Sequence, residues 1–199
     1  ENTELFLAGT YTESGDVNNG HLIIEGDSNV GPTESNVGVK GIYGGYTGSG
    51  SVSDSSVTIS AGTVKLDQPV INIAGGLTGS GTASNNKVNI KGGKITAEGS
   101  IEGGDGTSAS GNQVNISGGT IEKNSSDSTL AIIGGWSAKG LASNNSVNIS
   151  GGTITADEII GGLSGSSGTG GTGNSVNISG GSITAKRIYG AEGYGSNNT

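Results

Sequence analysis

The sequence has no cysteine, no methionine and only two prolines. Without cysteine, neither a disulfide nor a thiolate metal site can form, so backbone ladders and a core must hold the fold. No apolar run approaches the length of a membrane span or a signal-peptide core. We therefore expect no direct membrane insertion. Because residue 1 is not methionine, we expect residues 1–199 to be a single segment excised from a longer repetitive protein.

Positive charge is also scarce. The net charge is −8, and seven acidic residues but no basic residue precede Lys40. This balance argues against nucleic acid and anionic membrane surfaces as partners. Solubility is its simplest explanation.

The motifs of common enzyme classes are missing as well. The chain has one histidine, and it lacks a Gly-x-Ser-x-Gly elbow, a His-Glu-x-x-His helix and a phosphate-binding loop. Acidic residues do occur on neighbouring repeats, but not at equivalent strand positions; they are Glu98, Glu102, Asp105 and Glu122. The stretch around Asp105 has only a distant likeness to a calcium nonapeptide, which needs an Asp in every repeat. We predict a non-enzymatic protein with no cofactor and no metal.

What the sequence does contain is a repeat of about 30 residues, defined by two markers that run in step. The first marker is a Val-x-Ile triplet, found at 57–59, 88–90, 114–116, 147–149 and 176–178, with a weaker copy at 22–24. The second marker is an aliphatic residue, a variable residue and a small pair, beginning at Leu7, Ile42, Ile73, Ile101, Ile132, Ile159 and Ile188. A repeat of this kind outweighs any local motif in deciding the fold.

Each repeat is typical of three short strands. In Val147-Asn148-Ile149 the apolar residues alternate with a polar one, as in a strand with one buried face. Gly151-Gly152 then breaks this strand, because glycine accepts positive φ angles. A second strand follows at Thr153-Ile154-Thr155, and a third runs from Ile159 to Gly161-Gly162.

Three strands and three bends per repeat predict a triangular coil. Glycine density and β-branched strands exclude helices. The predicted fold is all-β, a parallel β-solenoid (right-handed β-helix) of about six coils of roughly 30 residues each. Stacked coils reward identical side chains at each rung, and Asp157-Glu158 lies one repeat from Lys186-Arg187, so these charges should pair.

The third strand carries the predicted contact residues. Its first position is always aliphatic, which predicts core, whereas its second position varies and predicts surface. Aromatic and aliphatic side chains at the second position, or just after the small pair, could stack on sugar rings or anchor a protein contact. These candidates are Tyr43, Tyr46, Ile133, Trp136, Ile160 and Tyr189. For Trp136 the alternative is packing beneath its own loop.

A ladder of outward asparagines is also expected, at Asn89, Asn115, Asn148 and Asn177. Stacking of their amides along the rod is its simple explanation. The more specific alternative is ice binding by a flat array of threonines, but Lys65, Lys94 and Glu122 interrupt any face that could form this array.

The repeated unit N-x-V-N-I-S-G-G-T-I-T-A…I-x-G-G, followed by a Gly/Ser/Thr/Asn loop, resembles the repeat regions of bacterial autotransporter (type V secreted) passenger domains and related adhesins. The resemblance covers almost the whole chain. It implies export, display at the outer surface of a bacterial cell, and adhesion to glycans or proteins of host or neighbouring cells, or self-association. It brings no site residues with it. A carbohydrate-active β-helix enzyme (lyase or glycosidase) and a passive spacer or surface-layer component are the alternatives.

Overall fold

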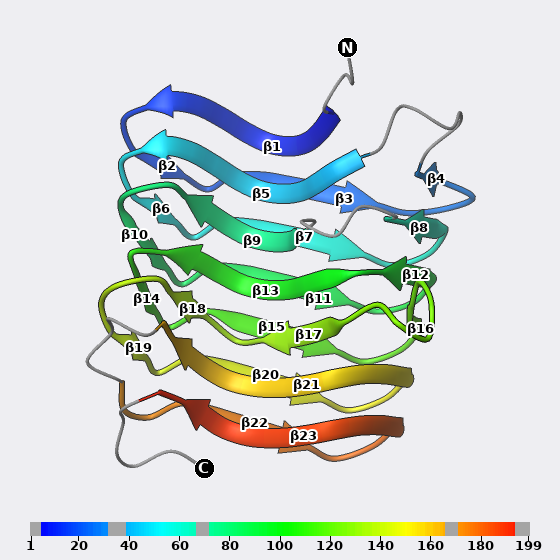
Figure 1. The fold of residues 1–199 in the computed structure, drawn as a ribbon. Helices are drawn as coiled ribbons and strands as arrows, with labels where there is room; N and C mark the ends of the chain where they lie inside the picture. The colour runs from blue at the N-terminus through cyan, green and yellow to red at the C-terminus, as the bar shows by residue number, and fades with distance from the viewer. Residues whose placement is uncertain (1–4, 32–38, 67–71, 166–170, 194–199) are drawn as a thin grey trace.

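Short strands rich in Val, Ile and Thr alternate with glycine and asparagine turns, and in the computed structural model they wind into a rod of stacked coils (Figure 1). The structure describes residues 5–31, 39–66, 72–165 and 171–193, and no helix occurs in these ranges. Every strand pairs in parallel with its counterpart one coil away. The predicted parallel β-solenoid is confirmed, with about five turns.

Each coil has four sides, which we name by their sequence features. The Gly-Gly side consists of β1 (Leu5–Ser14), β5 (Val39–Ser49), β9 (Asn72–Thr78), β13 (Gly99–Gly106), β17 (Leu130–Ile133), β18 (Trp136–Ser137) and the C-terminal parts of β21 (Thr153–Ser164) and β23 (Ser182–Glu192). The short side consists of β2 (Val17–Asn18), β6 (Val52–Ser53), β10 (Thr82–Ser84), β14 (Ser108–Ser110) and β19 (Ala142–Ser143).

The other two sides complete the coil. The Val-x-Ile side consists of β3 (His21–Ile24), β7 (Ser56–Ile59), β11 (Lys87–Ile90), β15 (Gln113–Ile116), β20 (Ser146–Ile149) and β22 (Ser175–Ile178). The Thr side consists of β4 (Asn29–Val30), β8 (Thr63–Lys65), β12 (Lys94–Ala97), β16 (Thr120–Lys123) and the N-terminal parts of β21 and β23.

The core is a narrow column of aliphatic side chains along the rod axis. Both apolar residues of the triplets on the inner coils point inward, as Val147 and Ile149 do, and so does the central residue of the Thr side, such as Ile154. The first position of the Gly-Gly side, exemplified by Ile159, completes the cluster, and all four are at most 1% exposed. The predicted inward positions are therefore confirmed for the inner coils, whereas on the last described coil Ile178 and Ile188 are 45% and 46% exposed and lie outside the core cluster.

The short side was not predicted, because its strands lie in what the sequence presents as a polar loop. Each of these strands places one small aliphatic residue inward at no more than 2% exposure; they are Val17, Val52, Ala83, Ala109 and Ala142. Serine and threonine around a single small residue give almost no hydrophobic signal, so this strand is specified by pairing with its neighbours.

The two Gly-Gly pairs of each repeat have different roles. The pair after the Val-x-Ile triplet makes the predicted turn, with positive φ at its second member, as at Gly152. The other pair does not end its strand as predicted, because β21 continues through Gly161-Gly162 to Ser164. Here a Cβ on Gly162 would lie 2.4 Å from the Asn174 side chain. The second pair is thus needed for close packing.

A buried asparagine ladder lies beneath these glycines and joins the short side to the Val-x-Ile side. Its rungs are Asn86, Asn112, Asn145 and Asn174, each at most 1% exposed. Asn145 Nδ2 donates to the Ala109 carbonyl and to Asn174 Oδ1, both at 3.1 Å. Its Oδ1 accepts from the backbone N–H and the side-chain amide of Asn112, at 3.0 and 3.1 Å.

A left-handed residue precedes every rung and turns the chain into it. Asn85 and Asn144 have φ values of 55° and 56°, and glycine occupies the same place at Gly111 and Gly173. Asparagine and glycine are the residues that adopt this conformation at least cost. The Asn-Asn and Gly-Asn dipeptides therefore encode a turn followed by a buried rung.

Candidate functional site

The outer surface of the Gly-Gly side brings together all six contact residues predicted from the sequence. Strand register arranges that surface in two columns that run along the rod. The first column contains Tyr43, Ala74, Glu102, Ile133, Ile160 and Tyr189. The second column contains Tyr46, Leu77, Asp105, Trp136, Leu163 and Glu192.

The prediction that the first column faces solvent is wrong, because most of its side chains are buried. Tyr43 is 8% exposed, Ile133 4% and Ile160 0%, yet none of the three belongs to the central core cluster. They form a separate apolar layer on the opposite face of the same sheet, because residues of a strand alternate in direction. Neighbouring rungs are only about 4.8 Å apart, so large side chains in one column cover one another. Tyr189, on the last described coil, is half-buried.

The second column is partly accessible. Tyr46, Leu77, Trp136 and Leu163 are all half-buried, between the fully covered first column and solvent. The bend at each Gly-Gly pair turns both columns to the same side, as the stacked Tyr43 and Tyr46 rings show, with centroids 5.5 Å apart. Trp136 contributes to this half-exposed surface.

An aromatic cluster lies at the N-terminal end of the Gly-Gly side, on the first two coils. Phe6 and Tyr11 from β1 meet Tyr43 and Tyr46 from β5, with ring centroids between 5.3 and 6.1 Å apart. Phe6 and Tyr11 are 39% and 49% exposed. Neither residue was predicted from the sequence, although Tyr11 follows Leu7 by four residues just as Tyr46 follows Ile42, which was the available signal.

Two acidic residues interrupt the apolar columns at their middle. Glu102 and Asp105 lie in β13, one in each column, and are 3% and 6% exposed. Burial raises the pKa of Glu102 to about 7. Burial and, to a smaller extent, the nearby Glu102 charge raise the pKa of Asp105 to about 9. Of the four acidic residues noted in the sequence, these two come together, and Glu122 instead pairs with Lys94 at 2.7 Å.

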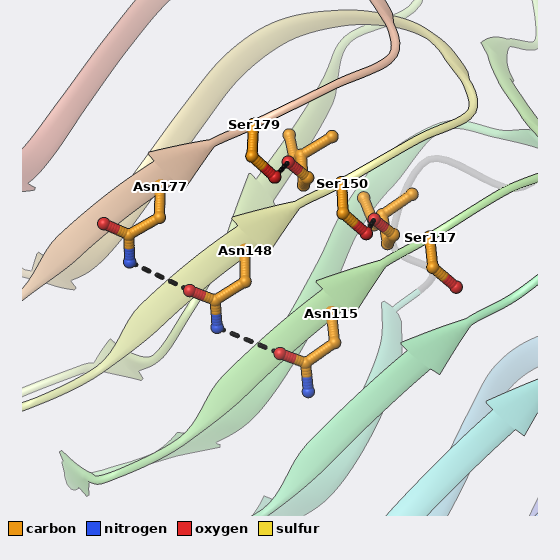
Figure 2. Close-up of a pocket in the computed structure, with 8 residues that line it drawn as sticks. Asn115, Ser117, Asn148, Ser150, Asn177 and Ser179 are labelled. Carbon is orange, nitrogen blue, oxygen red and sulfur yellow. Dashed lines mark hydrogen bonds between the residues drawn. The ribbon is translucent and has the colours of Figure 1, made fainter.

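A groove of about 340 Å³ lies on the Val-x-Ile side. Figure 2 shows its asparagine ladder and the serines beside it. Asn148 Nδ2 donates to Asn115 Oδ1, and Asn177 Nδ2 donates to Asn148 Oδ1, both at 2.9 Å. The predicted stacking of outward amides is therefore confirmed. Ser117 and Ser150 present exposed hydroxyls at its edge.

Charged residues meet where the Thr side joins the Gly-Gly side. Asp157 contacts Lys186 Nζ at 2.6 Å and Lys123 Nζ at 3.3 Å, and Glu158 pairs with Arg187. The predicted pairing between coils is thus confirmed. Hydrogen bonding from Lys186, followed by the Leu130 N–H and Lys123, lowers the pKa of Asp157 to about 2. This arrangement fixes register at the corner.

Residues 5–31, 39–66, 72–165 and 171–193 contain neither a metal-binding cluster nor a membrane-spanning helix. No group of three or more His, Asp or Glu side chains in these ranges could hold a metal ion. No helix long and apolar enough to cross a membrane occurs in them either. Comparisons with known protein families, with curated proteins and with solved structures give no match.

Proposed function

We propose that this chain is a non-enzymatic segment of a bacterial surface adhesin, or of its stalk, and that it contacts glycans or proteins of host or neighbouring cells. The observation that supports this best is the half-exposed apolar column on the Gly-Gly side, which continues into the aromatic cluster of Phe6 and Tyr11. Amphipathic aromatic side chains on a rigid surface are typical of recognition sites for sugars and proteins.

Repetition sets the expected mode of binding. The rod offers equivalent positions on successive coils, so several weak contacts can form at once. Linked contacts of this kind raise the overall affinity far above that of any one of them. Display of many copies on a cell surface, as the resemblance to autotransporter passengers implies, would add to this avidity.

The test is binding of the immobilised protein to a panel of glycans, extracellular matrix proteins and whole cells. We expect saturable binding that falls at least about tenfold in a Tyr11→Ala/Trp136→Ala variant, because each anchor contributes on the order of 1 kcal/mol or more. The matched control is Ile23→Ala, which removes an apolar side chain that is 61% exposed on the Val-x-Ile side.

Equal losses in both variants would show that binding is not specific to the Gly-Gly side. Clean absence of binding by a protein with an intact circular dichroism spectrum would contradict a recognition role and leave the stalk function. In a second form of the proposal, two copies of the rod associate with each other through the Gly-Gly side. Because Ile160 is fully buried, Trp136 and Leu163 are the residues to replace in testing it by light scattering.

The enzymatic alternative has one observation in its favour, the Glu102–Asp105 pair, since a carboxyl with a raised pKa can act as a general acid. Both carboxyls are nevertheless covered by the apolar layer, and a substrate would have to displace it. Release of reducing sugar from a polysaccharide would favour this alternative over adhesion.

A further inference from the structure

The Glu102–Asp105 pair is unusual because its place in the fold offers no neutralising charge. In a regular strand, residues three apart point to opposite faces, but the bend at Gly103-Gly104 turns both carboxyls to the outer apolar layer. Ser100 Oγ donates to Glu102 Oε1 at 2.6 Å. Glu102 Oε2 is buried with no hydrogen-bond partner.

The neighbouring strands supply only neutral groups. On one side β9 contributes Ala74 and Leu77, and on the other β17 and β18 contribute Ile133 and Trp136. The titratable groups that face the pair are tyrosines of β5, chiefly Tyr43, which is neutral at physiological pH because burial raises its pKa further. Within the described ranges, no ion pair reaches either carboxyl.

Two carboxylates cannot both stay ionised at such a site. Burial without a cation disfavours each charge, and each charge disfavours the other. A proton on Asp105 removes the repulsion and one of the two burial costs, and its O–H can donate to the otherwise unpartnered Glu102 oxygen. The protonated pair is then a hydrogen-bonded unit that the apolar layer can cover.

We propose that Glu102 and Asp105 form a proton-sharing latch that keeps the outer apolar layer of the Gly-Gly side closed, and that loss of the shared proton opens this layer locally. The inference does not depend on adhesion. Since the pair occupies the middle rung of both columns, opening would disturb the surface between the aromatic cluster and Trp136.

The direction of the pH effect follows from linkage. Both carboxyls have a higher pKa in the folded chain than when unfolded, so the folded state holds more protons between those values. The latch therefore stabilises the fold fully below about pH 4, and its contribution is lost as the pH rises through about 7 and then about 9.

Trp136 is the only tryptophan, and it lies directly opposite Asp105 on the next coil, so its fluorescence reports on the latch. We expect the emission of the wild-type protein to change on raising the pH from 5 to 9.5, with a midpoint above pH 6, well above that of an ordinary carboxyl. The Tm should fall over the same interval. In Glu102→Gln/Asp105→Asn, whose amides cannot ionise, both changes should disappear.

Glu122→Gln is the matched control, because it removes an acid whose pKa is lowered and should leave the transition unchanged. If the double variant does not fold, infrared spectroscopy of the wild-type protein decides: the carbonyl band of a protonated carboxyl must persist at pH 6 and lose most of its intensity by pH 9.5. A flat fluorescence and Tm profile, or an infrared spectrum without that band at pH 6, would overturn the proposal.

Discussion

Two asparagine ladders run along this rod only three residues apart in each repeat, one buried and one at the surface. The buried rung Asn145 uses both amide hydrogens and its carbonyl oxygen, and two of these bonds go to the backbone. The outer rung Asn148 bonds only to side chains, namely Asn115, Asn177 and Ser146. The two ladders therefore have different roles. Only the buried asparagines supply hydrogen bonds to backbone groups at the corner between the short side and the Val-x-Ile side.

The largest effect is expected from Asn145→Leu, which keeps the branched shape of the side chain but removes the buried amide. Asn112 would lose the acceptor for its backbone N–H and side-chain amide, and the Ala109 carbonyl would lose its donor. Each of these three buried groups, once unpaired, costs at least about 1 kcal/mol, so we expect a loss of at least about 3 kcal/mol. Urea denaturation followed by circular dichroism measures it. A loss below about 1 kcal/mol would mean that water reaches the ladder.

An intermediate effect is expected from Gly135→Ala. A Cβ at this position would lie 2.3 Å from Asn145 Oδ1, and overpacking of this kind costs about 1–3 kcal/mol. Combining it with Asn145→Ala should cost less than the sum, because the new methyl group enters the space that the amide leaves. Its combination with Asn148→Ala, on the outer ladder, should be additive. Additivity in both double variants would contradict the contact.

The smallest effect is expected from Asn148→Leu, the surface counterpart of the first substitution. Water can replace the lost side-chain bonds to Asn115 and Asn177, so the free energy of unfolding should fall by about 1 kcal/mol or less. The same urea titration gives the ratio of the two leucine variants directly. A cost equal to that of Asn145→Leu would show that the outer ladder also holds the coils together.

The sequence revealed the outer ladder but not the inner one. Asn148 lies between two aliphatic residues, so strand alternation places it outward. Asn145 precedes the triplet and looks like part of a Gly/Ser/Asn loop. The signal was present in the Asn-Asn and Gly-Asn dipeptides before every strand of the Val-x-Ile side from β11 onward, but polar residues in a glycine-rich stretch are more often solvated than buried.

The six predicted contact residues show the same limit. Their gathering on one side followed from the repeat, since equivalent positions must stack. Their exposure could not be predicted from the repeat. The variation among Tyr43, Ala74 and Glu102 suggested a position that faces solvent, whereas the close spacing of the coils buries all three. A varied column can be covered when its members differ in size and fill the space next to one another.

By itself, the sequence determined the period, the parallel solenoid, the inward aliphatic positions and the pairing of Asp157-Glu158 with Lys186-Arg187. These are properties of one repeat copied along an axis, so local periodicity is enough. Only the tertiary structure decided which polar side chains lose water: the bend at each Gly-Gly pair and the closeness of neighbouring coils bury Asn145, Glu102 and Asp105. Burial depends on what lies above and across from a residue, and no single repeat contains that information.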